Sequence, residues 1–219
     1  MSLDSGNVPR RAGRVTLVLA ALFLAALSVP PAWAAEAVGE VTRFRGDGTA
    51  AGGAPERSLA LGVEIHAGDT IRTRAATRVE IVFADGTKLT LGDDSSLTVD
   101  AFVYGGAQAP GEALFSLTAG VFRAVSGHIA ALSGAPLRVR TPIATIGIRG
   151  TEFWGRQTAD SLLVALLGGK GVYLENGAGR VEIAEVGFAV TVASAAEAPS
   201  APFCLTAAQV RAALGTVAW

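Results

Sequence analysis

Short apolar runs separated by glycine-containing turns make up most of this chain. The runs are rich in β-branched and aromatic residues, and their length, composition and spacing are typical of β-strands. They cover residues 38–45, 63–73, 78–83, 88–91, 96–102, 114–125, 137–140, 143–153, 162–167, 172–174, 180–184 and 188–192. Because no window among them keeps apolar residues at helical spacing for long, the pattern predicts an all-β domain.

The turn at Asp85-Gly86 tests how two of these strands are joined. A two-residue loop would pair Phe83 with Lys88 and place the bulky residues of the two strands on opposite faces of the sheet. A loop with an odd number of residues, or a corner between successive coils of a β-solenoid, returns them to one face. We favour the corner, which predicts a compact β-solenoid or β-helix-like fold; a β-sandwich is the alternative.

The end of the chain carries the one clear helix signal. Thr206 and Gln209 have the spacing of a capping box, and Gly215 supplies a stop. The apolar stripe of this helix would be Val210, Ala213 and Leu214. We therefore expect a short helix within a C-terminal tail at 203–219, joined to the β domain by a linker at 193–202 that has no periodicity.

The first 34 residues have the pattern of a secretory signal peptide. Basic residues precede an apolar run at 15–29, which ends at Pro30-Pro31 before the small-residue sequence 32–34. The apolar run of about 15 residues is short for a bilayer span. We predict cleavage after Ala34 and a periplasmic or secreted mature protein without a membrane span; a retained signal anchor is the alternative.

Composition and charge narrow the functional classes. The formal net charge is −1, and no run of Lys or Arg indicates nucleic-acid binding. The single cysteine, Cys204, cannot form an internal disulfide, and we expect it to be a small buried residue. Two histidines, His66 and His128, lie in no recognisable nucleophile and base motif or zinc-ligand spacing. We therefore expect no enzyme, no metal and no cofactor.

Four passages share a recognisable pattern: 61–73 (LGVEIHAGDTIRT), 79–91 (VEIVFADGTKLTL), 117–127 (LTAGVFRAVSG) and 139–153 (VRTPIATIGIRGTEF). Together they resemble the FecR domain family. The resemblance covers residues 38–192 and implies one FecR-like domain. The namesake regulators span the membrane and carry an iron-siderophore signal to a sigma factor. This chain has only about 14 residues before its apolar segment and a short tail, so the resemblance implies the domain without the sigma-factor circuit.

The family motif and two turns supply the candidate site residues. The structural or interaction motif comprises Thr141, Pro142, Gly147, Arg149, Gly150, Thr151, Phe153 and Trp154, and the turn motif comprises Gly68, Asp69, Asp85 and Gly86. Proline marks a strand entry, and the glycines allow a bend or a close backbone approach. Arg149 could pair with Glu152, or donate to neighbouring carbonyls, and so lock a corner; ligand contact is the alternative.

Three functions remain open. We rank first a non-catalytic protein-interaction or sensing module that binds another envelope protein, with cell-envelope signalling as one role for it. A module that binds cell-envelope polysaccharide comes second, and a cryptic enzyme third. Polysaccharide binding would require an exposed aromatic platform, for which Trp154 with Phe153, Tyr104 and Tyr173 are the candidates. Burial of Trp154 would exclude that version. Asp85, Asp93 and Asp94 could suggest calcium, but turn hydrogen bonding is their commoner role.

Overall fold

A computed structural model describes residues 1–2, 36–106, 109–132 and 137–219 of the chain. The predicted signal peptide and its cleavage site at Ala34 lie outside the described residues. The strands are β1 (Ala37–Arg45), β2 (Gly48–Ala51), β3 (Arg57–Ser58), β4 (Glu64–His66), β5 (Thr70–Thr73), β6 (Arg78–Phe83), β7 (Lys88–Leu91), β8 (Ser96–Tyr104), β9 (Gly111–Val125), β10 (Leu137–Arg140), β11 (Thr145–Ile148), β12 (Thr151–Gln157), β13 (Leu162–Gly169), β14 (Val172–Asn176), β15 (Gly179–Ile183), β16 (Phe188–Val192) and β17 (Phe203–Cys204). A 3-10 helix, η1 (Ile129–Ala131), and one α-helix, α1 (Ala207–Gly215), complete the described elements.

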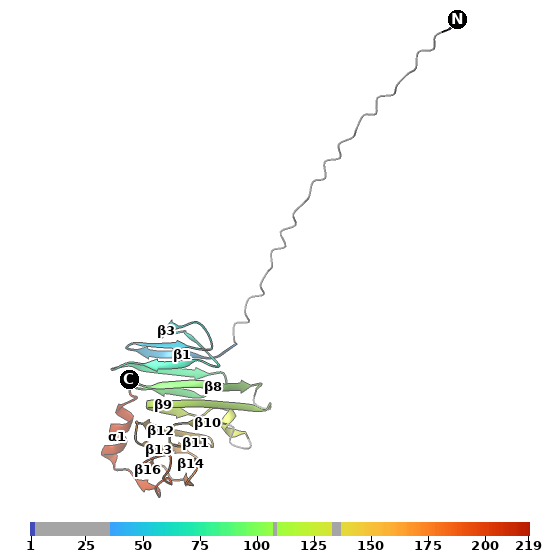
Figure 1. Ribbon diagram of the computed structural model, residues 1–219. Coiled ribbons are helices and arrows are strands. Elements are labelled where there is room, and N and C mark those ends of the chain that lie inside the picture. Colours follow the sequence, from blue (N-terminus) through green and yellow to red (C-terminus); the bar gives the residue numbers. More distant parts are fainter. Residues whose placement is uncertain (3–35, 107–108, 133–136) are drawn as a thin grey trace. The chain divides into compact units, whose positions relative to one another are not determined.

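The strands form one hydrogen-bonded sheet that folds into two layers (Figure 1). Layer A has the strand order β4-β1-β6-β7-β9-β12-β13-β16-β17. Layer B has the order β3-β2-β5-β8-β9-β10-β11-β14-β15. The chain crosses repeatedly between the layers, as in a solenoid, but neighbouring strands are antiparallel except for β9 and β10. The predicted all-β class with a short C-terminal helix is confirmed.

Strand β9 belongs to both layers. Its first part, up to Ala119, pairs with β8 and β10 in layer B. From Gly120 to Val125 it pairs with β7 and β12 in layer A. The two layers are therefore continuous through this one strand.

The turn between β6 and β7 corrects one expectation. Ile81 pairs with Leu89, and the Phe83 amide donates to the Thr87 carbonyl at 2.9 Å, which leaves three residues in the loop. Gly86 has a φ of 84°, a conformation that glycine adopts without steric penalty. The favoured corner between coils is wrong here. The odd-residue hairpin loop is found, and it places both bulky sets in the core.

The core lies between the layers. The Phe83 ring from layer A stacks on Phe102 at 5.2 Å and meets the edge of Phe115 at 5.1 Å, both from layer B. A second, smaller cluster lies on the other face of layer A. It consists of Val121, Trp154, Ala165, Ala189, Ala213 and Val217. Since the last two residues come from α1 and the segment after it, the C-terminal helix covers this face.

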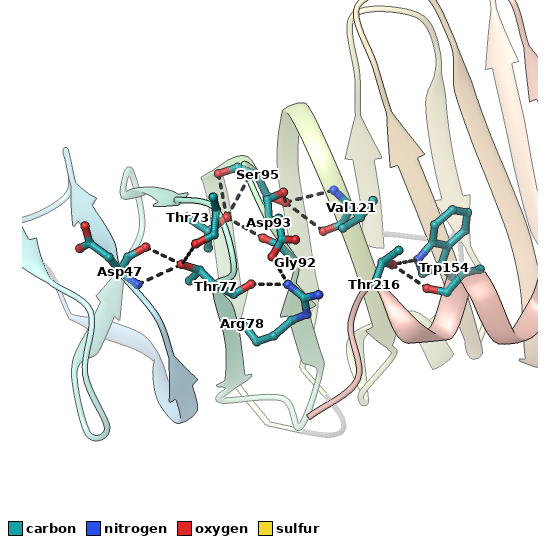
Figure 2. A network of polar contacts seen from close by, with 12 residues as sticks. Asp47, Thr73, Thr77, Arg78, Gly92, Asp93, Ser95, Val121, Trp154 and Thr216 are labelled. Atoms are coloured by element: carbon teal, nitrogen blue, oxygen red, sulfur yellow. Dashed lines mark hydrogen bonds and ion pairs between the residues drawn. The ribbon is translucent and has the colours of Figure 1, made fainter.

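Buried hydroxyl groups join successive turns of the chain (Figure 2). The Thr77 hydroxyl accepts from the Asp47 amide and donates to the Asp47 carbonyl, both at 2.9 Å. The Ser95 hydroxyl does the same with Val121, at 3.0 and 3.1 Å. We call this arrangement a hydroxyl clip, because one side chain satisfies both backbone groups of a distant residue.

The C-terminal helix begins with the predicted capping box. The Thr206 hydroxyl accepts from the Gln209 amide, and the Gln209 side chain accepts from the Thr206 amide. Figure 1 shows α1 alongside β12, β13 and β16. The linker at 193–202 stays a prediction. No helix among the residues that the structure describes is long and apolar enough to cross a membrane.

Candidate functional site

The family motif begins at the turn between β10 and β11. The Thr141 hydroxyl accepts from the amides of Ile143 and Ala144 at 3.2 and 3.1 Å and donates to the Ala144 carbonyl at 3.0 Å. Pro142 is exposed at this turn, where its missing amide leaves no ladder hydrogen bond unmade. Both residues thus lie in the turn that leads into β11.

A tyrosine ring packs against strand β11. Ile146 and Ile148 point into the core, so Gly147 between them faces the opposite side of layer B. Gly147 pairs with Tyr173 of β14, and a Cβ atom at position 147 would overlap the tyrosine ring. The predicted close approach at Gly147 is therefore found, and its reason is the ring of Tyr173.

The pairing of Arg149 with Glu152, one of the two structural roles considered for Arg149, is not found. The chain turns at Gly150, whose φ is 67°, and passes from layer B to layer A. The two side chains therefore leave different layers. Glu152 accepts from Arg123 at 2.7 and 2.9 Å, whereas Arg149 is half-exposed and lies 3.5 Å from Glu182.

Arg149 lines a pocket of about 520 Å³. The lining residues are Ala130, Ala131, Leu132, Arg149, Gly150, Lys170, Tyr173 and Arg180. We call it the Tyr173 pocket. The Arg180 guanidinium lies 3.7 Å from the centre of the Tyr173 ring and that of Arg149 lies 5.8 Å from it. Two guanidinium groups thus cover a tyrosine that is only 8% exposed, in the geometry of cation–π contacts.

Lys170 and Arg180 reach this pocket from positions that sequence reasoning missed. Lys170 lies between β13 and β14, and its amide donates to the Gly150 carbonyl at 3.2 Å. Arg180 belongs to β15, where it pairs with Glu175 of β14. The pairing of β11, β14 and β15 brings Arg149, Lys170 and Arg180 together, and no local sequence motif predicts that pairing.

The last part of the motif is buried and structural. Thr151 forms a third hydroxyl clip: its hydroxyl donates to the Gly171 carbonyl at 2.7 Å and accepts from the Gly171 amide at 3.2 Å. Phe153 is fully buried and meets Phe122 edge-on at 5.4 Å. Trp154 is 2% exposed, and its Nε1 donates to the Thr216 hydroxyl at 3.0 Å.

The four aromatic residues considered for polysaccharide binding do not form an exposed platform. Phe153, Trp154 and Tyr173 are buried, and the half-buried Tyr104 stacks on His128 at 6.2 Å. The version of the polysaccharide hypothesis that depended on an exposed Trp154 is therefore excluded.

Asp69 organises the turn between β4 and β5 from a fully buried position. Its carboxylate accepts from the amides of Gly53, Ala54 and His66 at 3.1, 3.3 and 2.7 Å, and it forms an ion pair with Arg57. Burial raises the pKa of this carboxyl, but the Arg57 contact and the amide hydrogen bonds together hold the pKa below its ordinary value. The negative charge of Asp69 is thus paired and hydrogen-bonded by groups of the fold itself.

Asp85 has the same structural role at the turn between β6 and β7. Its carboxylate accepts from the Thr87 amide and hydroxyl at 2.8 and 2.9 Å and from the Ile129 amide at 3.1 Å. Gly68 and Gly86, beside the two aspartates, both have positive φ angles. The turn motif therefore shapes the scaffold.

The other chemically interesting residues form no cluster within the described ranges. Asp93 is paired with Arg78, and no group of three or more potential metal ligands is found among the described residues. Cys204 is exposed in β17, so its expected burial is wrong: β17 lies at the edge of layer A and pairs with β16 over two residues.

A family model described as FecR protein matches residues 69–170, which confirms the resemblance to the FecR domain family. The match lies within the predicted domain at 38–192 and includes the motif from Thr141 to Trp154. A comparison with curated proteins found no match.

Two solved structures share the fold. They are crystal structures of a "putative anti-sigma factor" from Parabacteroides distasonis, at 1.65 and 2.50 Å resolution. Each is 16% identical to this chain, with TM-scores of 0.53 and 0.52. The alignments cover 66% of this chain and 64% and 63% of those proteins, so the chain spans less than two thirds of their length.

Proposed function

We propose that this chain is a non-catalytic protein-interaction and sensing module that works outside the cytoplasm in cell-envelope signalling, because a FecR family model matches residues 69–170. The family match carries this proposal. The solved structures with the same fold are described as anti-sigma factor candidates, which agrees with a regulatory role. The signal-peptide pattern of residues 1–34 supports a periplasmic or secreted location.

The arrangement of the family motif supports partner binding through its exposed residues. Thr141 and Thr151 are occupied by backbone hydrogen bonds, and Phe153 and Trp154 are packed inside. Arg149 differs, because it is half-exposed and faces the Tyr173 pocket. A partner would therefore meet the motif at Arg149 and at the cations beside it.

The test is capture of a partner by the full chain. The chain carries a C-terminal affinity tag, is expressed in its native host, and is crosslinked in envelope extract before mass spectrometry. We expect recovery of a specific envelope protein. An exposed arginine outside the pocket supplies a matched control: Arg74→Gln should recover the partner, and the double variant Arg149→Gln/Arg180→Gln should recover less. Recovery of no specific protein by the wild-type chain would contradict the proposal.

Location is tested separately. Fractionation of the cells, followed by N-terminal sequencing of the chain, should place it outside the cytoplasm with residue 35 as its first residue. A chain in the cytoplasmic fraction that begins at Met1 would contradict export.

A further inference from the structure

The Tyr173 pocket has one more positive charge than its own carboxylates neutralise. Arg149 lies 3.5 Å from Glu182 and Arg180 lies 3.3 Å from Glu175. Lys170 lines the same pocket, is exposed, and has no ion pair among the described residues. We propose that this pocket binds the carboxylates of an acidic peptide segment on the partner protein. The inference rests on the proposed function and names the chemistry of its partner.

The two arginine pairs can be replaced by an incoming carboxylate. All four side chains are close to half-exposed, and both distances are long for a charge-assisted hydrogen bond. Exposed pairs of this kind contribute little to stability, because water competes for both ions. Exchange of Glu182 or Glu175 for a partner's carboxylate is therefore nearly neutral for the fold.

The guanidinium groups are positioned before a ligand arrives. The Tyr173 ring lies against Gly147 and is held there by the pairing of β11 with β14. Arg180 stacks on this ring at 3.7 Å. A stacked guanidinium uses its planar face on the ring and keeps N–H groups at its rim, which match a carboxylate in a bidentate arrangement. Less side-chain entropy is then lost on binding.

The apolar part of the pocket lining favours a peptide over a nucleic acid. Ala130 and Leu132, in η1 and directly after it, give the pocket an apolar side. A carboxylate next to an apolar side chain fits such a wall, whereas a polyanion would require an extended basic surface. Three cations against two glutamates, in a chain of net charge −1, do not provide that surface.

The test is an NMR titration of the purified full chain with defined peptides. The probes are acetyl-Gly-Glu-Leu-Glu-Gly-amide, the same peptide with both glutamates replaced by glutamine, and inorganic phosphate. We expect the glutamate peptide to cause saturable shifts of the amide signals of Gly150, Lys170 and Tyr173, and the glutamine peptide to cause none. The shifts should weaken as salt is raised.

Variants separate the pocket from general charge effects. Arg149→Gln/Arg180→Gln should weaken binding of the glutamate peptide about tenfold, since two charge-assisted contacts are lost. Arg74→Gln, which removes an exposed arginine paired with Asp47 elsewhere in the fold, should leave the affinity unchanged.

Three results would overturn the inference: equal affinity in the double variant, equal binding of the glutamine peptide, or phosphate shifting the same signals with the affinity of the glutamate peptide. Failure of the proposed function is distinguishable. A wild-type chain that recovers an envelope protein but does not bind the glutamate peptide contradicts the pocket assignment alone.

Discussion

Replacement of Thr151 by valine tests whether the hydroxyl clips hold the domain together. Valine has nearly the shape of threonine, so the substitution keeps the packing and removes the hydroxyl. Thr151 is 3% exposed, and its hydroxyl bonds to both the amide and the carbonyl of Gly171 in a buried environment. The variant therefore leaves buried backbone groups of Gly171 without that partner.

The expected loss follows from the hydrogen bonds that remain. A buried donor or acceptor without a partner costs about 1–3 kcal/mol. The Gly171 amide loses the hydroxyl as acceptor, whereas the Gly171 carbonyl also accepts from the Arg149 amide at 3.3 Å and keeps that bond. The lost hydrogen bond to the carbonyl adds about 0.5–1.5 kcal/mol, so we expect a total loss of about 1.5–4.5 kcal/mol in the free energy of unfolding.

Urea unfolding followed by tryptophan fluorescence measures this loss as a lower midpoint with an unchanged slope. Thr151→Ser keeps the hydroxyl and should cost about 1 kcal/mol for the lost methyl group. Thr42→Val removes an exposed hydroxyl that bonds to Glu80, and its effect should stay within about 0.5 kcal/mol. If Thr151→Ser cost as much as Thr151→Val, the methyl group and not the hydroxyl would be the important contact, and the reasoning would be refuted.

Three further predictions concern other parts of the molecule. Because the folded-state pKa of Asp69 lies below its ordinary value of 3.8, its contribution to stability is present above that value and is lost as pH falls through the folded pKa. As pH is lowered from 6, the free energy of unfolding should fall more steeply for the wild type than for Asp69→Asn. Equal dependence of this free energy on pH in the two proteins would contradict the prediction. Gly147→Ala should lower the thermal midpoint of unfolding and shift the Tyr173 ring signals in NMR spectra, since the new methyl group overlaps that ring. Unchanged ring signals would show that the Tyr173 ring does not lie against residue 147. Trp154→Phe removes the hydrogen bond to Thr216 and should cost about 1 kcal/mol. Amide hydrogen exchange should then be faster in α1, whereas uniform acceleration over the whole domain would indicate a general packing defect.

Much of the strand pattern could be predicted from local sequence. The bounds expected for β6, β7, β10 and β16 are those observed, because each combines apolar residues with clear turn signals at its ends. β2 was missed, since Gly48–Ala51 consists of small residues without bulky alternation. β17 was missed because its two residues are a strand only through their pairing with β16. At Asp85-Gly86 the strand pattern argued correctly against a two-residue loop, but local sequence could not distinguish an odd-residue hairpin from a corner, and the favoured corner is wrong.

The candidate site was less predictable, because its residues meet through non-local strand pairing. Arg149 stood out within a family motif, but Lys170 and Arg180 belong to segments with no motif of their own. The proposed Arg149 and Glu152 pair failed for the same reason. Closeness in sequence made this pair one option for Arg149, yet a change of layer at Gly150 separates the two side chains.

The sharing of β9 between the two layers has a consequence for the order in which this domain can fold. β9 pairs with β7 and β8, which precede it, and with β10 and β12, which follow it. Neither layer can complete its ladder until the chain on both sides of β9 has been brought together over long loops, and closing such loops slows folding. Hydrogen bonds on the two sides should consequently form and break in one cooperative step, so that neither layer persists as a folded intermediate without the other.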